Sequence, residues 1–367
     1  MRVLVVSGIW PPDVGGPASH APEVAAFLAE HGHEPTVLVT AGAAPAAAPY
    51  PLEWVPRSLP PGVRHLRALA AVRRLARRAD VVYSTGMFGR SGLGSLLARR
   101  PYVLKLTADP AFERARRRGL HPGSLAAFQD DRSLRTLPLR AARDAIVRRA
   151  AHVVCPSAYL AELAAGWGVP PERVSVLPNP APDVDALPSR EELRARHGFA
   201  GPTLVFAGRL TAQKSLELAL DACARAGVRL VVVGDGPERA RLEALGGADF
   251  VGARPRGEVL ELFRAADASI LSSSWENFPH GVVESLAAGT PVIATAVGGV
   301  AEVVADGENG LLVPSGDAAA LAAAIRRYLE EPGLAERLRA AAAPSVERYS
   351  RTRVYTRLLE LLTEASR

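Results

Sequence analysis

Short apolar segments alternate with amphipathic segments along the whole chain, and this alternation constrains the fold more than any other feature. The first half contains "RVLVVSG", "TVLVT", "VVYST", "YVLKLT" and "AHVVCPS", separated by helix-like segments such as residues 18–31 and 64–80. Nearly continuous apolar strands are typical of parallel sheets that helices cover on both faces. The sequence therefore predicts an α/β protein.

The alternation stops once and then restarts. Residues 176–190, "VLPNPAPDVDALPSR", contain four prolines and no regular pattern. Beyond them come "TLVFAG", "RLVVVG", "ASILSS" and "GLLVP". A chain of 367 residues exceeds the usual size of one hydrophobic core. We predict two doubly wound, Rossmann-like domains, 1–180 and 181–349, with the carboxyl ends of both sheets facing a central cleft.

Charge is distributed unevenly between the two halves. Residues 1–180 hold 23 Lys+Arg and 13 Asp+Glu, a net charge of +10, whereas residues 181–367 have a net charge of −4. The first half is therefore expected to face an anionic partner. Aromatic residues make up 5% of the chain and no stacking platform is evident, which argues against nucleic acid as the partner.

Other bulk features favour a cytoplasmic protein. There are two cysteines, Cys155 and Cys223, which suit a reducing compartment and suggest no metal cluster. No apolar stretch is long enough to span a bilayer, and the start of the chain resembles a buried strand rather than a signal peptide. The basic segment 64–78 has two interpretations, a solvated helix face or a contact with anionic lipid at the inner face of the plasma membrane.

Glycines and two cations occupy the loops that follow predicted strands. Gly16 precedes a helix start, where backbone N–H groups can approach a phosphate; a tight turn is the alternative. Arg209 and Lys214, in "AGRLTAQKS", would suit a diphosphate. Lys214 is notable because the chain has only one other lysine, Lys105. Gly234, in "VVVGDGPE", is expected to shape its loop, with Asp235 capping a helix from Pro237.

Two glutamates flank another predicted helix start, in "SSSWENFPHGVVESLAAGTPVIAT". The strand should end near Ser274 and the helix should begin near His280. Glu276 would then lie on the loop and Glu284 on the first helical turn. Carboxylates accept hydrogen bonds from hydroxyl groups, and the loop amides from Asn277 to Gly281 can meet a phosphate. The alternatives are helix-dipole compensation for Glu284 and an exposed loop position for Glu276.

Four of these segments together resemble the retaining glycosyltransferases of family 4, the group 1 family, which have the GT-B fold. The matching segments are "GRLTAQK", Gly234 to Pro237, "ENFPHGVVESLAAGTPVIAT" with its two glutamates eight positions apart, and "GGVAEVVADGENGLLV". The resemblance covers nearly the whole chain. It also implies that a C-terminal helix, residues 350–367, returns to the first domain.

The resemblance implies a donor site for a nucleotide-diphospho-sugar such as a UDP- or GDP-hexose. Arg209 and Lys214 would contact the diphosphate, Glu276 the sugar hydroxyls and Glu284 the ribose. The remaining donor-site residues would approach the donor through backbone groups; they are Gly16, Gly234, Asn277, Phe278, Pro279 and Gly281. The implied enzyme is a hexosyltransferase that retains anomeric configuration and needs no metal or other cofactor.

On the acceptor side the chain departs from many family members. At the end of "YVLKLT" and just after it, where a histidine is common, it has Thr107, Ala108 and Asp109. It is more similar to a bacterial subset whose pattern matches Lys105, Asp109 and Glu113. Asp109 would bind a sugar hydroxyl or accept the acceptor proton; a salt bridge to one of the arginines 114–118 is the alternative. His20 is a further acceptor-side residue, with a structural role as its alternative.

The expected function is transfer of a sugar to a glycan, a lipid-linked or a small-molecule acceptor. One rival is another GT-B enzyme that binds the same donor, such as a nucleotide-sugar epimerase. A second rival is a non-catalytic nucleotide-sugar binding protein. The intact set of Arg209, Lys214, Glu276 and Glu284 argues against the second.

Overall fold

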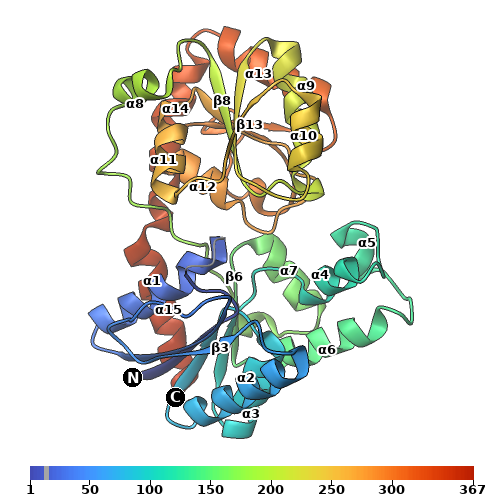
Figure 1. Ribbon diagram of the computed structural model, residues 1–367, viewed down its shortest axis with the longest axis vertical. Coiled ribbons are helices and arrows are strands. Elements are labelled where there is room, and N and C mark those ends of the chain that lie inside the picture. The colour runs from blue at the N-terminus through green and yellow to red at the C-terminus, as the bar shows by residue number, and fades with distance from the viewer. Residues whose placement is uncertain (12–15) are drawn as a thin grey trace. The chain divides into compact units, whose positions relative to one another are not determined.

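The computed structural model describes residues 1–11 and 16–367, with residues 16–19 described by their backbone only (Figure 1). The chain divides into two compact units. The first unit comprises Met1–Asn179 and Thr352–Arg367, and the second comprises Pro180–Arg351. Each unit has one parallel sheet with helices packed against it, as the alternation of apolar segments predicts.

The first unit contains a seven-stranded sheet in the order β3-β2-β1-β4-β5-β6-β7, and every pair of neighbours is parallel. Its strands are β1 (Arg2–Ser7), β2 (Glu34–Ala41), β3 (Leu52–Pro56), β4 (Val81–Ser84), β5 (Tyr102–Lys105), β6 (His152–Cys155) and β7 (Val174–Val176). Its helices are α1 (Gly16–Glu30), α2 (Pro61–Ala76), α3 (Phe88–Ala98), α4 (Pro110–Arg117), α5 (Leu125–Gln129), α6 (Leu137–Arg148), α7 (Ala158–Gly166) and α15 (Arg351–Ser366).

The last helix packs on the sheet that the first strand begins. Val354, Leu358 and Leu362 of α15 are buried in one cluster with β-strand residues such as Val3 and Val5. The hydroxyl of Tyr355 also donates to Glu23 of α1 at 2.8 Å. Residues 352–367 thus complete the core of the first unit.

The second unit contains a six-stranded parallel sheet in the order β10-β9-β8-β11-β12-β13. Its strands are β8 (Thr203–Ala207), β9 (Arg229–Val233), β10 (Asp249–Gly252), β11 (Ala268–Leu271), β12 (Val292–Thr295) and β13 (Gly310–Val313). Its helices are α8 (Arg190–His197), α9 (Leu216–Ala226), α10 (Arg239–Leu245), α11 (Arg256–Ala265), α12 (His280–Ala287), α13 (Ala318–Glu330) and α14 (Leu334–Val346).

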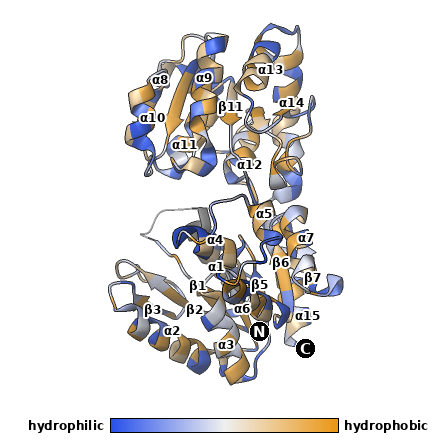
Figure 2. Ribbon diagram, turned by 90° about the vertical axis from the view of Figure 1, so that its right-hand side faces the viewer, coloured by the Kyte–Doolittle hydropathy of each residue, from blue (hydrophilic) through white to orange (hydrophobic). Residues whose placement is uncertain are grey.

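Buried strands and amphipathic helices account for both units. Figure 2 shows hydrophobic colouring along β6 and mixed colouring on α2, as expected for a strand covered on both faces and a helix covered on one. Asp317 caps α13 as expected, since its carboxylate accepts from the backbone N–H of Ala320 at 2.8 Å.

In each sheet the direction of strand addition reverses once. The reversal lies between β1 and β4 in the first unit and between β8 and β11 in the second. Doubly wound sheets bind ligands just beyond the carboxyl ends of the two strands at such a point. The loops after β8 and β11 are the ones that carry Arg209, Lys214 and Glu276.

Some local expectations were wrong. Strand β11 ends at Leu271 rather than near Ser274, and residues 108–131, which show no clean periodicity in the sequence, contain α4 and α5. Strand β3 and helix α3 were not expected at all. The pattern around α3 is weak because "FGRSGLGSLLA" includes three glycines, which lower helix propensity.

Candidate active site

Two loops of the second unit meet at the reversal point of its sheet, and they bring Lys214 and Glu276 into contact. Lys214 ends the short 3-10 helix η2 (Ala212–Lys214) after β8, and Glu276 lies in the loop after β11. The Lys214 ammonium forms an ion pair with Oε1 of Glu276. The Ser273 hydroxyl donates to the same oxygen at 2.7 Å. Glu276 is therefore not an exposed loop residue: only 6% of it is accessible.

Backbone and side-chain hydrogen bonds hold these two loops together. The Gln213 amide donates to the carbonyl of Trp275 at 2.8 Å, and the N–H of Ser274 donates to the carbonyl of Gln213 at 2.8 Å. The Ser272 hydroxyl donates to the carbonyl of Lys214 at 2.9 Å. These hydrogen bonds join the two loops into one frame, which holds Lys214 and Glu276 in position.

A third loop packs against this frame through glycine. Gly234 follows β9 with φ +137°, and a Cβ there would overlap the carbonyl oxygen of Gly208. The N–H of Gly208 bonds to the carbonyl of Val233 at 3.0 Å, and the N–H of Leu210 bonds to that of Asp235 at 2.9 Å. The shaping role expected for Gly234 agrees with this packing. The capping role of Asp235 was wrong, since α10 begins at Arg239 with Glu238 at its N-cap.

Glu284 lies on α12 and is held from another helix. It is the fifth residue of α12, so it belongs to the second turn rather than the first. Nε of Arg256, the first residue of α11, donates to Glu284 Oε1 at 3.0 Å. Dipole compensation at the first turn is therefore not the reason for this carboxylate.

The start of α12 packs against the end of β8. A Cβ on Gly281 would lie 3.4 Å from the carbonyl oxygen of Ala207, so the first turn of α12 approaches that strand closely. Phe278 is buried and its ring meets those of His280 and Tyr349 edge-on. Asn277 and Pro279, on either side of Phe278, belong to the segment that joins the β11 loop to α12.

Arg209 differs from the other site residues because its side chain is exposed. Within the described part of the chain it makes no hydrogen bond or ion pair. It follows β8 directly, in the loop that ends at Lys214. Gly16 is the first residue of α1 in the first unit, and residues 12–15 before it lie outside the described residues.

The structure gives Asp109 an ion-pair partner other than the arginines 114–118. Its carboxylate is fully buried and caps α4, accepting from the backbone N–H groups of Ala111 and Phe112 at 2.8 and 3.1 Å. The other oxygen accepts from Arg143 at 2.6 Å and from Gln129 at 3.1 Å. The ion pair is thus with Arg143, not with the arginines 114–118. Four donors and complete burial favour a structural role over a catalytic one.

The other three acceptor-side residues differ in burial and in their hydrogen-bond partners. Lys105 is buried and donates to the carbonyl of Leu177 at 2.7 Å, and burial lowers its pKa to about 7. His20 is buried against Tyr83, whose hydroxyl is 2.8 Å from its Nε2, which agrees with the structural alternative. Glu113 is exposed in the first turn of α4.

Two features of the described residues bear on metals and membranes. No group of three or more His, Cys, Asp or Glu side chains within them is placed to hold a metal ion. No helix among them is long and apolar enough to cross a bilayer.

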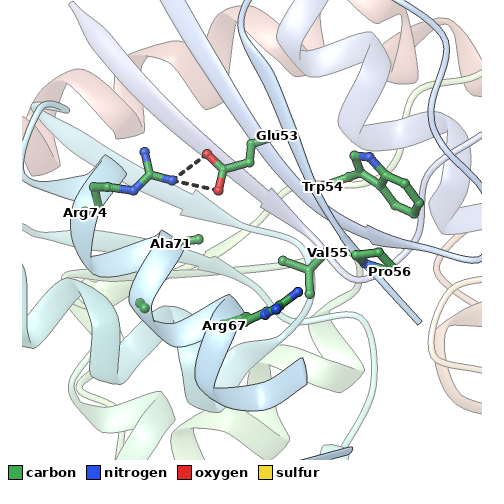
Figure 3. Close-up of a pocket in the computed structure, with 8 residues that line it drawn as sticks. Glu53, Trp54, Val55, Pro56, Arg67, Ala71 and Arg74 are labelled. Carbon is green, nitrogen blue, oxygen red and sulfur yellow. Dashed lines mark hydrogen bonds and ion pairs between the residues drawn. The ribbon is translucent and has the colours of Figure 1, made fainter. Parts of the chain in front are cut away.

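In the first unit, a pocket of about 350 Å³ lies between β3 and α2. Figure 3 shows its wall, where Glu53 on β3 faces Arg74 on α2 in an ion pair of 2.6 Å. Trp54 and Arg67 also line this pocket. None of the predicted donor residues lines this pocket, but Arg67, Ala70, Ala71 and Arg74 belong to the basic segment 64–78.

Sequence reasoning missed Ser273, Gln213 and Arg256, which position the predicted residues. A serine run before Glu276 was visible in the sequence, but serines are common in loops. Arg256 is 28 positions from Glu284 in the sequence. No local pattern connects those two residues, so only the packing of α11 beside α12 could reveal the pair.

The two sheets, their reversal points and the paired loops define a class, the GT-B proteins. The chain is similar over 99% of its length to Anabaena HepE, solved in complex with UDP and glucose. The TM-score is 0.80, with 22% sequence identity and all of that chain covered. This similarity concerns the fold.

Sequence comparisons identify the family. Residues 189–344 match the model of glycosyl transferases group 1, and residues 15–180 match that of a glycosyl transferase 4-like domain. A GDP-mannose-dependent alpha-mannosyltransferase of Mycobacterium tuberculosis is 32% identical over 86% of this chain and 85% of its own. A glycogen synthase of the same species is 29% identical over 92% and 88%. The chain belongs to the group 1 glycosyltransferases.

Proposed function

We propose that this glycosyltransferase moves a hexose-type sugar from a nucleoside-diphosphate donor to an acceptor hydroxyl, with retention of anomeric configuration. The observation that carries the proposal is the contact between Lys214 and Glu276 at the reversal point of the second sheet. One residue is suited to a diphosphate and the other to sugar hydroxyls. Their contact supports a single site for both proposed functions.

The ion pair suggests how a donor would be accepted. Lys214 has three N–H donors, so its ammonium can turn toward phosphate oxygens while remaining near Glu276. The carboxylate of Glu276 would then accept from sugar hydroxyls in place of the ammonium. Glu284, oriented by Arg256, would accept from the ribose, and the exposed Arg209 would bind the diphosphate. Backbone groups of Gly16, Gly234 and residues 277–281 would complete the donor contacts.

Transfer would break the bond between the anomeric carbon and the diphosphate oxygen and form one to the acceptor oxygen. The acceptor proton would leave with the diphosphate or with a nearby base. Negative charge grows on the departing diphosphate, and Arg209 and Lys214 would stabilise it electrostatically. We therefore propose that these cations supply the charge stabilisation without a metal ion or another cofactor.

The donor is proposed to be a UDP- or GDP-sugar. A relative is named as GDP-mannose-dependent, and a protein of the same fold was solved with UDP and glucose. The acceptor is proposed to be a glycan, a lipid-linked or a small molecule, bound by the first unit. Exposed apolar side chains on α2 and α3 support a lipid-linked acceptor.

Helices α2 and α3 present apolar side chains to solvent. We call Val63, Leu66, Leu93, Leu96 and Leu97 the α2–α3 ridge; each is between 44% and 69% exposed. The two helices pack closely, because a Cβ on Gly94 would lie within 2.5 Å of Val72. Residues 54–108 hold eleven Lys+Arg and one carboxylate, Asp80. Exposed leucines among cations suit an anionic bilayer, so we propose peripheral contact with the inner face of the plasma membrane.

The test of the proposed function is turnover with a radiolabelled nucleotide sugar and a panel of acceptors, followed by NMR of the product. The expected product keeps the anomeric configuration of the donor. Glu276→Gln should lower kcat by about 100-fold or more if this carboxylate acts on the reacting sugar. Release of nucleotide should depend on the acceptor. An altered sugar without transfer would instead indicate an epimerase.

A further inference from the structure

The first unit has a cluster of cations at the carboxyl edge of its own sheet. Helices α2, α3 and α4 follow the parallel strands β3, β4 and β5, so they begin at the carboxyl edge of the sheet. Arg64, Arg90 and Arg114 are the fourth, third and fifth residues of these helices. Three guanidinium groups from three different helices therefore lie at the edge where such sheets bind ligands.

These cations lie close enough to affect one another. The pKa of Arg90 is lowered, first by partial burial and then by the charges of Arg64 and Arg114. The pKa of His65, on α2, is lowered by burial and then by Arg90, Arg64 and Arg114. Among the described groups, no carboxylate contributes to either shift. Burial and the two neighbouring cations thus both disfavour the charged form of Arg90.

Some other arginines of the first unit pair with carboxylates. Arg2 pairs with Asp80 at 2.7 Å, Arg74 with Glu53 at 2.6 Å, and Arg143 with Asp109 at 2.6 Å. In the described part of the chain, Arg90 and Arg114 have no ion pair and no side-chain hydrogen bond. Arg64 donates only to the backbone carbonyl of Arg57, at 2.8 Å. The cluster is therefore not compensated within this part of the chain.

We propose that Arg64, Arg90 and Arg114 bind a phosphate group of the acceptor. This inference rests on the proposed glycosyl transfer and narrows its acceptor to a phosphorylated alcohol. A phosphate ester offers negative charge and several acceptor oxygens, which guanidinium groups can bind in a bidentate way. Two sources share this chemistry, a soluble phosphate ester and a phospholipid headgroup. Phosphate binding would offset the repulsion among the three guanidinium groups.

The test uses the full chain with its donor site saturated by nucleoside diphosphate, so that added phosphate cannot report on that site. Glycerol phosphate is then added, with glycerol as the uncharged control, and Tm is measured. A co-sedimentation arm uses vesicles of phosphatidylglycerol against phosphatidylcholine. Arg90→Met removes one charge of the cluster but keeps an aliphatic stem. Arg118→Ala is the matched control, because Arg118 is exposed at the far end of α4.

The expected result is a rise in Tm with glycerol phosphate, or retention on phosphatidylglycerol vesicles. Arg118→Ala should show the same response as the wild type. Arg90→Met should bind the phosphate with an apparent affinity about tenfold lower. The first response indicates a soluble acceptor and the second a lipid headgroup. Without ligand, Arg90→Met should have a Tm equal to or above that of the wild type, since it relieves repulsion. A purely structural arginine would lower the Tm instead.

Two results would overturn the inference. One is the absence of any response to both phosphate sources, and the other is an equal response in Arg90→Met. If Arg90→Met fails to fold, Arg114→Ala serves in its place, because Arg114 is exposed. Stabilisation by the nucleoside diphosphate, measured in the same variants, tests the proposed function separately and should be unchanged by these substitutions.

Discussion

Lys105 is an ionisable side chain enclosed in the sheet of the first unit. It is 1% exposed, and the one hydrogen bond of its ammonium among the described residues is to the carbonyl of Leu177. Burial lowers its pKa from 10.5 to about 7 because the ammonium loses its hydration. The neighbouring Cys155 does not compensate, since burial raises the pKa of that thiol to about 12.

This burial predicts a pH-dependent stability. Between pH 7 and 10.5 the unfolded chain binds the Lys105 proton and the folded chain releases it, so stability rises with pH across this window. Lys105→Met should be more stable than the wild type near pH 7. That advantage should shrink by about 1.4 kcal/mol per pH unit as the pH rises. Urea unfolding at several pH values measures it; Leu104→Met should show a constant difference, and a constant difference for Lys105→Met would refute the prediction.

Asp109 provides a second prediction at this scale. Asp109→Asn leaves the buried Arg143 without its partner, so we expect the first unit to lose about 3–5 kcal/mol of stability. The double variant Asp109→Asn/Arg143→Met should lose much less than the sum of the two single losses. Urea unfolding of all four proteins forms the cycle. A well-folded Asp109→Asn that binds nucleotide but has no turnover would favour the catalytic interpretation instead.

At the residue scale, a site residue could be predicted where its residue type is rare in the chain. Lys214 was selected because lysine is rare in this chain, and the structure places it against Glu276. The partner of Asp109 was not predictable, because Arg143 is 34 positions away on α6. The four arginines at 114 and 116–118 lie much nearer to Asp109 in the sequence, so proximity suggested the wrong partner. Burial of Lys105 also left no local signal, since strand patterns do not reveal what covers a side chain.

At the scale of elements, the loop after β9 requires a residue without a side chain at position 234. Gly234→Ala would force a Cβ into the carbonyl of Gly208 at a backbone angle that alanine rarely adopts. We expect a loss of about 3 kcal/mol or more, together with weaker nucleotide binding. Gly201→Ala is the control, because a Cβ there meets nothing within 4 Å and needs no unusual φ. Thermal unfolding compares the two, and a Gly234→Ala variant as stable as Gly201→Ala would contradict the packing described.

The α2–α3 ridge gives a prediction about membranes. Leu66→Ser combined with Leu97→Ser should weaken co-sedimentation with anionic vesicles by about tenfold, since two exposed apolar side chains no longer enter the bilayer. Leu245→Ser is the matched control, because Leu245 is 58% exposed on α10 of the second unit. Binding that does not depend on anionic lipid, or on these leucines, would remove the membrane proposal. A change of oligomeric state would point to a second copy of the chain instead.

Elements with strong periodicity or clear capping could be predicted from the sequence, and the others could not. The apolar segments before residue 110 predict β1, β2, β4 and β5, and Asp317 predicts the start of α13. Strand β3 was missed because "LEWVP" is short and follows an Ala/Pro-rich stretch. Helix α4 was missed because four of the residues in "PAFERARR" are charged, which hides the buried face formed by Ala111, Phe112 and Ala115.

At the scale of the whole molecule, the restart of the alternation predicts two α/β units, and the structure divides at Asn179 and Pro180. Strand order was not predictable from periodicity alone, because a parallel sheet permits several orders. The order matters for function, since it places the loops after β8 and β11 side by side. The resemblance to a family supplied residue roles that spacing could not, and those roles remain proposals for this chain.

The central claim is that the second unit binds a nucleoside diphosphate through Arg209, Lys214, Glu276 and Glu284. The most direct measurement is a thermal-shift titration of the full chain with UDP, GDP and ADP, beside the variant Glu284→Ala. The account predicts that one nucleotide stabilises the wild type by about 2.7 kcal/mol at 100 times its Kd, and that Glu284→Ala loses most of this effect. Stabilisation by none of the three, or an equal effect in Glu284→Ala, would contradict the account.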